Sequence, residues 1–415
     1  MITFHTAYIH NSTQGGYMPG PLEGIRVLDL SRILAGPYCT MTLSDMGAEV
    51  IKVERPEVGD RSRGIGPFVG DQSSYFMSIN RGKKSVTIDI FNPDGRSMMT
   101  ELVRQSDVLV ENFVPGTLER MGFGYSSVKE INPKMIYASI SGFGQTGPYS
   151  HKPALDVIVQ AMGGIMSVTG LPGLGPMRPG ASLGDSIAGL FTSLAITSAL
   201  FRRQSTQQGE FIDISMLDCQ VTMMENAFAR YFATQEVPGP LGSRHPVATP
   251  FQAFEANDGS FVVALLTDNL EQWSKFCHAI GRPELGPDQR YTTNLLRTTN
   301  YDQLIQELQT TFKLKGRMFW IEALSTVAIP CGPVNSIPEV INDPQVQHRE
   351  MIVEIPHKEL GSWKVANTPF NFSSDIPVRE YKSAPRLSEH TREIFKEILG
   401  MTSEEIGELS DAGII

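Results

Sequence analysis

The chain has 415 residues, of which 41% are hydrophobic and 19% are charged, and its formal net charge is −10 at pH 7. This composition is typical of a soluble globular protein, and the length exceeds one ordinary hydrophobic core, so two domains are predicted. The acidic balance argues against a nucleic-acid-binding protein, which would neutralise phosphates with a broad basic surface. It leaves room for a local group of Arg and Lys side chains that binds a small phosphorylated ligand.

The spacing of the cysteines and the composition of the N-terminal residues indicate the cellular compartment in which the protein is expected. The four cysteines lie far apart, with no pair at metal-ligand or redox spacing, so a reducing compartment is expected. The histidines show no zinc-binding spacing, and no metal is predicted. Residues 1–19 are polar and lack the features of a secretory signal or a transit peptide, so we predict a disordered lead-in before the fold begins near Pro21. With no run of eighteen apolar residues, we expect no membrane contact and a cytoplasmic protein, the mitochondrial matrix being the alternative.

Strand-like runs alternate with helical segments in the first half of the chain, which is the pattern of an α/β domain around a largely parallel sheet. In chain order, the predicted strands are residues 25–30, 48–53, 85–90, 107–113, 135–141 and 210–216. Helices are predicted from Pro37, over 92–104, over 187–203, and after the last strand to about Phe232. We therefore predict a large, doubly wound (Rossmann-like) α/β domain over residues 20–232.

The composition changes after this domain. Residues 233–250 hold four prolines and are predicted to be a linker. A hairpin is predicted over 254–266 around Asn257-Asp258-Gly259-Ser260, because Asp-Gly is a strong turn signal. With this hairpin, residues 251–345 form a predicted smaller α+β domain. The other predicted elements beyond the linker are helices over 270–280, 301–313 and 391–399 and a strand over 351–355.

An acidic residue precedes the helix predicted over 187–203, which is apolar on nearly every side and typical of a buried helix. Leu183-Gly184-Asp185-Ser186 leads into it, so the Asp185 carboxylate would meet unpaired backbone N–H groups and the positive end of the helix dipole, which favour its ionised form. Two interpretations stay open at this point. Asp185 or Ser186 is an ordinary N-cap, which this segment by itself favours, or Asp185 is a covalent nucleophile.

Residues 142–147 (GFGQTG) match the G-x-G-x-x-G pattern after a predicted strand. A dinucleotide site also needs a helix that opens there and an acidic residue about twenty positions later, whereas Pro148 follows and position 167 is serine. The pattern therefore gives only weak support to an NAD-dependent oxidoreductase. Close approach of this backbone to another ligand is the alternative interpretation.

Basic residues gather in the loops at the ends of the predicted strands. They are Arg55, Arg61, Arg63, Arg81, Lys83 and Lys84. Because ligands of open α/β sheets bind beyond the carboxyl ends of the strands, these cations together indicate a phosphate-bearing ligand, although each by itself is an ordinary surface charge. Asn112 and Phe113 end another predicted strand, where an ordinary strand terminus is the alternative.

Taken in order, several segments resemble the class III CoA-transferase family, the carnitine and bile-acid type that includes formyl-CoA transferase. The segments are Pro21–Asp29 (PLEGIRVLD), Gly47–Pro56 (GAEVIKVERP), Val110–Gly116 (VENFVPG), Gly142–Pro148 (GFGQTGP) and Gly184–Ser186 (GDS). The resemblance is dense from about Pro21 to Leu217 and looser beyond. It implies transfer of CoA from an acyl-CoA to a free carboxylic acid, with a CoA thioester as substrate and no tightly bound cofactor.

For the site, the resemblance implies that Asp185 is the nucleophile. It would attack the donor thioester to form an acyl-aspartyl anhydride and CoA thiolate, and the thiolate would then form an aspartyl-CoA thioester that the acceptor acid opens. Backbone N–H groups near the helix start could stabilise the oxyanions. The CoA-contacting positions of the family fall here on Leu34, Ala35, Arg55, Ile88, Asn112, Phe113 and Arg120.

The chain departs from some family members in three places. Phe91 replaces a lysine that contacts a CoA phosphate, and Leu155 stands before Asp156 where the racemase branch has its histidine. The glycine-rich loop of formyl-CoA transferases is missing between about Pro240 and Phe254. An acyl-CoA racemase or epimerase is therefore an alternative function, but this chain lacks the histidine that would serve as its second proton carrier. Formyl-CoA and oxalate are not favoured as substrates.

Within the family, Phe68–Gly70, Ser139–Gly142 and Gly242–Pro246 are similar to the succinyl-CoA:glutarate branch. This similarity favours succinyl-CoA as donor and a dicarboxylate such as glutarate as acceptor, with Arg63, Arg244 and His245 as candidates to bind the distal carboxylate. The family fold implies an interlocked homodimer in which a C-terminal segment, residues 346–415, returns to the large domain. A non-catalytic CoA-binding protein is a further alternative.

Overall fold

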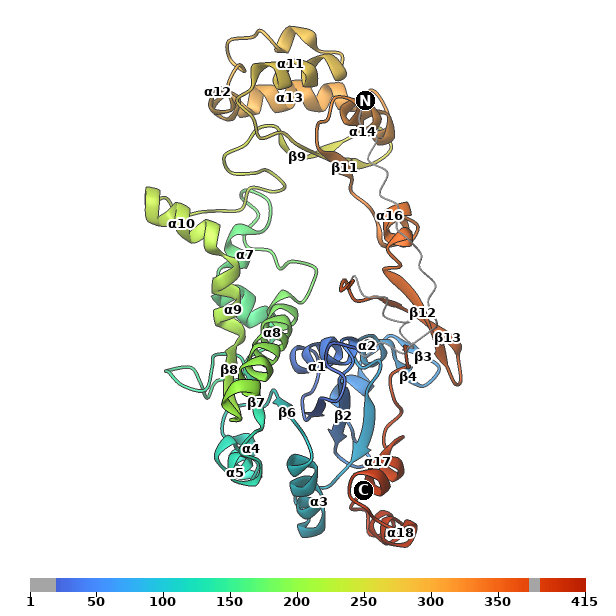
Figure 1. The fold of residues 1–415 in the computed structure, drawn as a ribbon. Helices are drawn as coiled ribbons and strands as arrows, with labels where there is room; N and C mark the ends of the chain where they lie inside the picture. The colour runs from blue at the N-terminus through green and yellow to red at the C-terminus, as the bar shows by residue number, and fades with distance from the viewer. Residues whose placement is uncertain (1–19, 373–380) are drawn as a thin grey trace. The chain divides into compact units, whose positions relative to one another are not determined.

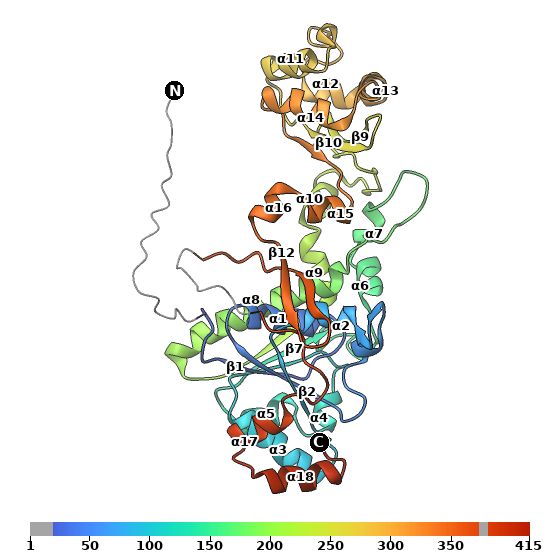
Figure 2. The ribbon, with the colours of Figure 1, turned by 90° about the vertical axis from the view of Figure 1, so that its right-hand side faces the viewer.

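The structure is a computed structural model, and it describes residues 20–372 and 381–415. The predicted disordered lead-in, residues 1–19, lies outside the described residues. The chain forms two compact units, whose elements can be followed in Figure 1 and Figure 2. The larger unit runs to Gly163 and continues over Gly180–Glu225 and Glu350–Ile415, and the smaller unit consists of Gly164–Pro179 and Asn226–Arg349.

A six-stranded parallel sheet forms the centre of the larger unit (Figure 1). Its strands are β1 (Arg26–Asp29), β2 (Glu49–Glu54), β5 (Lys84–Thr87), β6 (Val108–Glu111), β7 (Ile136–Ser141) and β8 (Glu210–Ser215). They lie in the order β5-β2-β1-β6-β7-β8, and every neighbouring pair is parallel. This order, which starts at the centre and proceeds outward in both directions, is that of doubly wound α/β sheets. The six predicted strands and the α/β class are confirmed.

Helices cover both faces of this sheet, because its strands bury side chains on both sides. Val27 belongs to a core cluster shared with α1, α8 and α9, whereas Leu28 belongs to a cluster shared with α3, α5, α17 and α18. Successive strand residues point to opposite faces, so strands buried on both sides read as continuous hydrophobic runs. The helices are α1 (Ala35–Asp45), α3 (Pro93–Arg104), α5 (Tyr125–Ile131), α8 (Leu183–Thr206), α9 (Met216–Met223), α17 (Thr391–Glu397) and α18 (Ser403–Asp411).

Shorter elements complete the larger unit. They are the 3-10 helix η1 (Arg61–Gly64), β3 (Phe68–Val69), β4 (Gln72–Ser73), α2 (Ser74–Ile79), α4 (Thr117–Arg120), α6 (Asp156–Met162), β12 (Ile352–His357) and β13 (Gly361–Ala366). The C-terminal segment is part of this unit from Glu350 onward, since α17 and α18 place Ile394, Phe395 and Ile406 in its core.

Helix α8 begins earlier than predicted, at Leu183, with Ser182 as its N-cap residue. Asp185 therefore lies inside the first turn, and the interpretation of Asp185 or Ser186 as the N-cap is wrong. By length and hydropathy α8 could cross a membrane, but it packs with α1 and with strands β7 and β8. Its burial is one-sided, because Leu190, Leu194 and Phe201 are exposed in the single chain, which corrects the expectation of a fully buried helix.

The smaller unit packs helices around a three-stranded antiparallel sheet in the order β11-β10-β9. The predicted hairpin is confirmed as β9 (Phe251–Glu255) and β10 (Ser260–Ala264), and β11 is Cys331–Pro333. Aromatic side chains such as Phe261, Trp273 and Phe312 fill its core. Its helices are α7 (Ile165–Val168), α10 (Glu225–Thr234), α11 (Leu270–Ala279), η2 (Pro283–Leu285), α12 (Asn294–Thr299), α13 (Tyr301–Phe312), α14 (Arg317–Thr326), α15 (Ile337–Ile341) and α16 (Pro344–His348).

The boundary between the units differs from the predicted boundary in two places. The chain passes from the larger to the smaller unit after Glu225, whereas the prediction extended the large domain to residue 232. Helix α10, which follows, has no buried side chain. Residues 164–179 lie inside the predicted large domain but belong to the smaller unit, where the carbonyl of Gly170 accepts a hydrogen bond from the N–H of Gly242 at 2.8 Å. This pairing joins segments far apart in the chain, so no local pattern indicates it.

Candidate active site

Two neighbouring cavities lie at the carboxyl ends of the strands, where ligands of open α/β sheets bind. The first, which we call the strand-end cavity, has a volume of about 380 Å³ and lies beyond β1, β2, β5 and β6. Its arginines Arg32, Arg55 and Arg61 make it suited to an anionic ligand. It is lined by Leu30, Ser31, Arg32, Val53, Glu54, Arg55, Val58, Gly59, Asp60, Arg61, Ile88, Asp89, Ile90, Phe91, Phe113, Leu118 and Met121.

The second cavity, which we call the Asp185 cavity, has a volume of about 280 Å³. It combines apolar side chains, three cations and the carboxylates of Asp156 and Asp185. It is lined by Arg32, Ile33, Ala35, Arg61, Asn112, Phe113, Val114, Pro115, Ile140, Ser141, Gly142, Lys152, Ala154, Leu155, Asp156, Asp185 and Met216. Such a lining can hold a short acyl chain beside a carboxylate and balance added negative charge.

The two cavities meet at Arg32, Arg61 and Phe113, which line both of them. The Arg32 guanidinium lies over the Phe113 ring, 4.3 Å from its centroid. Burial and the nearby charge of Arg61 lower the pKa of Arg32, while Asp60 opposes this change. Two like charges held side by side favour a multiply charged anion, and a ligand that extends from one cavity into the other would pass them.

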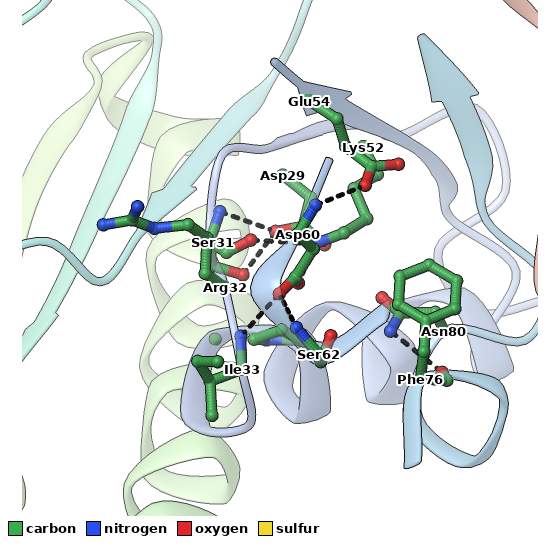
Figure 3. A network of polar contacts seen from close by, with 12 residues as sticks. Asp29, Ser31, Arg32, Ile33, Lys52, Glu54, Asp60, Ser62, Phe76 and Asn80 are labelled. Carbon is green, nitrogen blue, oxygen red and sulfur yellow. Dashed lines mark hydrogen bonds and ion pairs between the residues drawn. The ribbon is translucent and has the colours of Figure 1, made fainter. Parts of the chain in front are cut away.

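The loop that carries Arg32 has a strained backbone that buried side chains hold in place (Figure 3). Ile33 has a φ of +68°, a left-handed conformation that β-branched residues rarely adopt. Asp60 Oδ1 accepts hydrogen bonds from the N–H groups of Ile33 (3.1 Å) and Ser62 (2.8 Å). Lys52 Nζ donates to the carbonyl of Ser31 (2.8 Å) and lies 2.9 Å from Asp60. The loop is therefore tied to β2 and to the segment before η1.

Asn112, the residue that follows β6, holds the same loop. Its Oδ1 accepts a hydrogen bond from the N–H of Arg32 at 2.8 Å, and its Nδ2 donates to the carbonyl of Arg32 at 2.7 Å. Both ends of this side-chain amide are thus engaged with the backbone of the chain. Asn112, predicted as a CoA contact, lines the Asp185 cavity and positions Arg32.

The loop rests on a buried network of three carboxylates and three cations. Its members are Asp29, Glu54, Asp60, Lys52, Lys83 and Arg63, paired by Lys52–Asp60 (2.9 Å), Lys83–Asp29 (2.9 Å) and Arg63–Glu54 (2.6 Å). Burial by itself would raise the pKa of Asp60, but Lys52 outweighs it and the pKa is lowered. Burial lowers the pKa of Lys83 to about 8 although Asp29 opposes it. The network is charge-balanced, so removal of one member leaves a buried charge without compensation.

Asp156 holds the first turn of α8 in place. It is the first residue of α6, and its Oδ1 accepts a hydrogen bond from the N–H of Gly184 at 2.8 Å while its Oδ2 accepts one from Gln160 at 2.7 Å. A Cβ at Gly184 would lie 2.6 Å from Val159 Cγ2 and 3.0 Å from Asp156 Oδ1, so only glycine fits this approach. A carboxylate at helix N–H groups is stabilising, and here it fixes the backbone next to Asp185.

Tyr75, in α2, lies in the field of the same acids. Burial raises the pKa of Tyr75 to about 12, and the carboxylates of Asp185, Asp60 and Asp156 contribute in that order. The phenol is already protonated at neutral pH at its ordinary pKa of 10.0, and this shift moves it further from ionisation. No sequence pattern singles out this residue.

The structure brings most of the predicted site residues together. Ala35, Asn112, Phe113 and Asp185 line the Asp185 cavity, and Arg55, Ile88 and Phe113 line the strand-end cavity. Neither cavity is lined by Leu34, which packs with Met41 and Ile79, or by Arg120, which donates to Thr117 at 3.1 Å.

The three residues predicted to bind the distal carboxylate line neither of these two cavities. Arg63 donates two hydrogen bonds to Glu54 (2.8 and 2.6 Å), so its guanidinium is already engaged. Arg244 and His245 belong to the smaller unit, where Arg244 lies over the ring of Tyr301 and His245 stacks on Phe251.

Sequence reasoning missed the cavity residues Arg32, Ser141 and Lys152, and it missed Asp156 as the residue that holds α8. It also missed Tyr75, which lines neither cavity. Ser141 ends β7, and Arg32 follows β1, so the rule that ligands bind beyond strand ends could have indicated both. The segment 142–147 lines the Asp185 cavity only through Gly142, and the next helix after this segment is α6, which begins at Asp156. The dinucleotide fingerprint therefore lacks its helix.

Comparisons with known proteins show which proteins this chain is similar to. The sequence model described as CoA-transferase family III matches residues 22–391. Succinyl-CoA:glutarate CoA-transferase of Mus musculus is 41% identical over 396 residues, which cover 95% of this chain and 90% of that protein. Acetyl-CoA:oxalate CoA-transferase of Acetobacter aceti is 40% identical over 379 residues, covering 91% and 96%. The crystal structure of a CAIB/BAIF family protein from Brucella suis superposes with a TM-score of 0.83 at 38% identity, covering 92% of this chain and all of that one.

Proposed function

Since this chain belongs to CoA-transferase family III, we propose that it moves CoA from succinyl-CoA to a dicarboxylate such as glutarate, with Asp185 as nucleophile. The observation that carries the proposal is the position of Asp185. It lies in the first turn of α8 and lines a cavity that meets the strand-end cavity at two arginines. The strand-end cavity, with Arg55 and Ile88, would hold the nucleotide part of CoA, and the thioester would reach Asp185.

The proposed reaction proceeds through two kinds of covalent intermediate. An Asp185 oxygen attacks the thioester carbonyl, the C–S bond breaks, and an aspartyl-succinyl anhydride and CoA thiolate form. The thiolate attacks the aspartyl carbonyl and expels succinate, which leaves an aspartyl-CoA thioester. The acceptor carboxylate then attacks this thioester, and the released thiolate takes the acceptor acyl group and regenerates Asp185. No net proton is gained or lost, so a carboxylate without a general base suffices.

The dicarboxylate part of the proposal rests on relatives and on charge. Succinyl-CoA:glutarate CoA-transferase of Mus musculus and the oxalate enzyme of Acetobacter aceti have nearly the same identity to this chain, so identity does not select the acid. Arg32, Arg61 and Lys152 in the Asp185 cavity support an acid with a second charge. Arg244 and His245 of the smaller unit stay proposed contacts of the distal carboxylate, and Arg63 supports the site through Glu54.

We also propose that the chain works as an interlocked homodimer in the cytoplasm. The exposed Leu190, Leu194 and Phe201 on α8 support a partner surface, because apolar side chains of this size are normally covered in soluble proteins. A racemase has less support, since none of the described residues that line the Asp185 cavity is a histidine and Leu155 is among them.

The test is an acyl-CoA exchange assay. The protein is incubated with succinyl-CoA and one acid at a time, glutarate or oxalate, and new acyl-CoAs are followed by mass spectrometry. We expect glutaryl-CoA from the wild type and none from Asp185→Ala. Asp218→Ala is the matched control, because Asp218 is an exposed acid in the first turn of α9. Transfer by Asp185→Ala at the wild-type rate, or no transfer to any acid, would reject the proposal.

A further inference from the structure

The Asp185 cavity holds a polar group that the chain itself leaves unsatisfied. Ser141, the last residue of β7, is 6% exposed and lines this cavity. Its hydroxyl is buried and has no hydrogen-bond partner within residues 20–372 and 381–415. Of the buried polar side-chain atoms that lack a partner in those ranges, only the Oγ of Ser141 belongs to a residue that lines the Asp185 cavity.

Neighbouring serines of the sheet show that strand residues here normally satisfy their hydroxyls. Ser139, two residues earlier on the same face, donates to Glu111 and accepts a hydrogen bond from Gln145 at 2.8 Å. Ser215, which pairs with Ser141 in the sheet, accepts one from the N–H of Asp218 at 3.1 Å. Because an unsatisfied buried hydroxyl is costly, the exception at Ser141 indicates a partner supplied by a ligand.

We propose that the Ser141 hydroxyl donates a hydrogen bond to an oxygen of the carboxyl group that reacts with Asp185, so that Ser141 is a second catalytic residue. The inference rests on the proposed CoA transfer. The first and last attacks of that transfer place a negative charge on an oxygen of the substrate carbon beside Asp185, whereas the two attacks on the aspartyl carbonyl place it on an oxygen of Asp185 itself. A donor at this position binds the charged oxygen more strongly than the neutral carbonyl oxygen, so its contribution appears in the rate.

The charges of the cavity explain why a neutral donor suits the reacting carboxyl group. Arg32, Arg61 and Lys152 already supply cations for a permanent charge on the bound acid. A cation at the reacting end would also bind the unreacted carboxylate tightly, which stabilises the ground state and slows turnover. A hydroxyl avoids this ground-state binding and still stabilises the intermediate.

The test compares wild type with Ser141→Ala and Ser141→Cys in the succinyl-CoA and glutarate assay. Ser193→Ala is the control, because Ser193 is a buried serine of α8 whose hydroxyl already donates to Leu190 at 2.8 Å. For Ser141→Ala we expect kcat to fall about 10²-fold, the effect of losing one oxyanion donor, with little change in the KM for glutarate. Since no internal hydrogen bond is lost, its melting temperature should equal or exceed that of the wild type. Ser141→Cys keeps the shape but has a weak donor, so it should lose activity as Ala does.

Each other outcome contradicts the proposal in a distinct way. An unchanged kcat in Ser141→Ala would show that the hydroxyl does not donate to the reacting oxygen. A raised KM at constant kcat would place the hydroxyl at the distal carboxylate, a lowered melting temperature would show a structural hydroxyl, and full activity in Ser141→Cys would show that shape alone matters. No transfer by the wild type would reject the proposed function and this inference together, whereas an active wild type with an equally active Ser141→Ala rejects only the inference.

Discussion

Replacement of Asp60 by asparagine should destabilise the larger unit and weaken CoA binding at the same time. Asp60 is 2% exposed, and its carboxylate accepts hydrogen bonds from Ile33 and Ser62 and pairs with Lys52 at 2.9 Å. Asparagine keeps the volume and one acceptor oxygen but removes the charge. Lys52 then has its nearest carboxylate in Asp29, 3.9 Å away, and the buried network holds three cations against two carboxylates.

The expected loss follows from the burial of this pair. Removing one partner of a buried ion pair costs about 3–5 kcal/mol of unfolding free energy, because the other charge stays buried. The matched control is Glu101→Gln, whose partner Arg104 is 55% exposed, and an exposed pair of this kind contributes about 0.5 kcal/mol or less. Asp60 also holds the left-handed Ile33, so the loop with Arg32 should relax and the Kd for free CoA should rise.

Urea unfolding followed by circular dichroism measures the first effect, and calorimetric titration with CoA measures the second. We expect a clearly lower urea midpoint for Asp60→Asn than for Glu101→Gln, at an unchanged dependence on urea concentration. Equal midpoints for the two variants would refute the argument from the buried pair. A lowered midpoint with an unchanged Kd would show that Asn112 by itself is enough to hold the loop.

Three further predictions concern other parts of the larger unit. Gly184→Ala should slow transfer several-fold, because its Cβ meets Val159 and Asp156, whereas a Cβ at Gly180 meets nothing within 4 Å, so Gly180→Ala should keep the wild-type kcat. Arg63→Met leaves Glu54 buried without its bidentate partner and should lower the urea midpoint at pH 7 more than at pH 4, where Glu54 can take up a proton. Burial raises the pKa of Glu111 from 4.5 to about 7 although Ser139 opposes it, so this group stabilises the fold fully below pH 4.5 and loses that contribution as pH rises through 7. Glu111→Gln should therefore gain stability relative to wild type between pH 5 and pH 8, and a constant difference in melting temperature would contradict it.

The local sequence was sufficient for the strands of the parallel sheet, for the hairpin of the smaller unit and for the family. The parallel strands are short apolar runs such as VLV in β6, and the hairpin of the smaller unit follows from Asn257-Asp258-Gly259-Ser260, because period and turn chemistry are properties of neighbouring residues. The order of the motifs around Asp29, Arg55, Asn112 and Asp185 is enough to indicate the family, and the apolar run after Asp185 places this residue near a helix start.

Only the tertiary structure decided how the site is held. The start of α8 at Leu183 depends on Asp156, which accepts a hydrogen bond from the N–H of Gly184 although the two residues are 28 positions apart in the chain. Asn112 likewise fixes the backbone of Arg32, which is 80 positions away. The unsatisfied hydroxyl of Ser141 is likewise invisible in the sequence, since satisfaction depends on every neighbour in space. Hydrogen bonds between side chains and distant backbone leave no periodic trace in the sequence. Sequence reasoning therefore indicated the proposed nucleophile and missed the residues that position it.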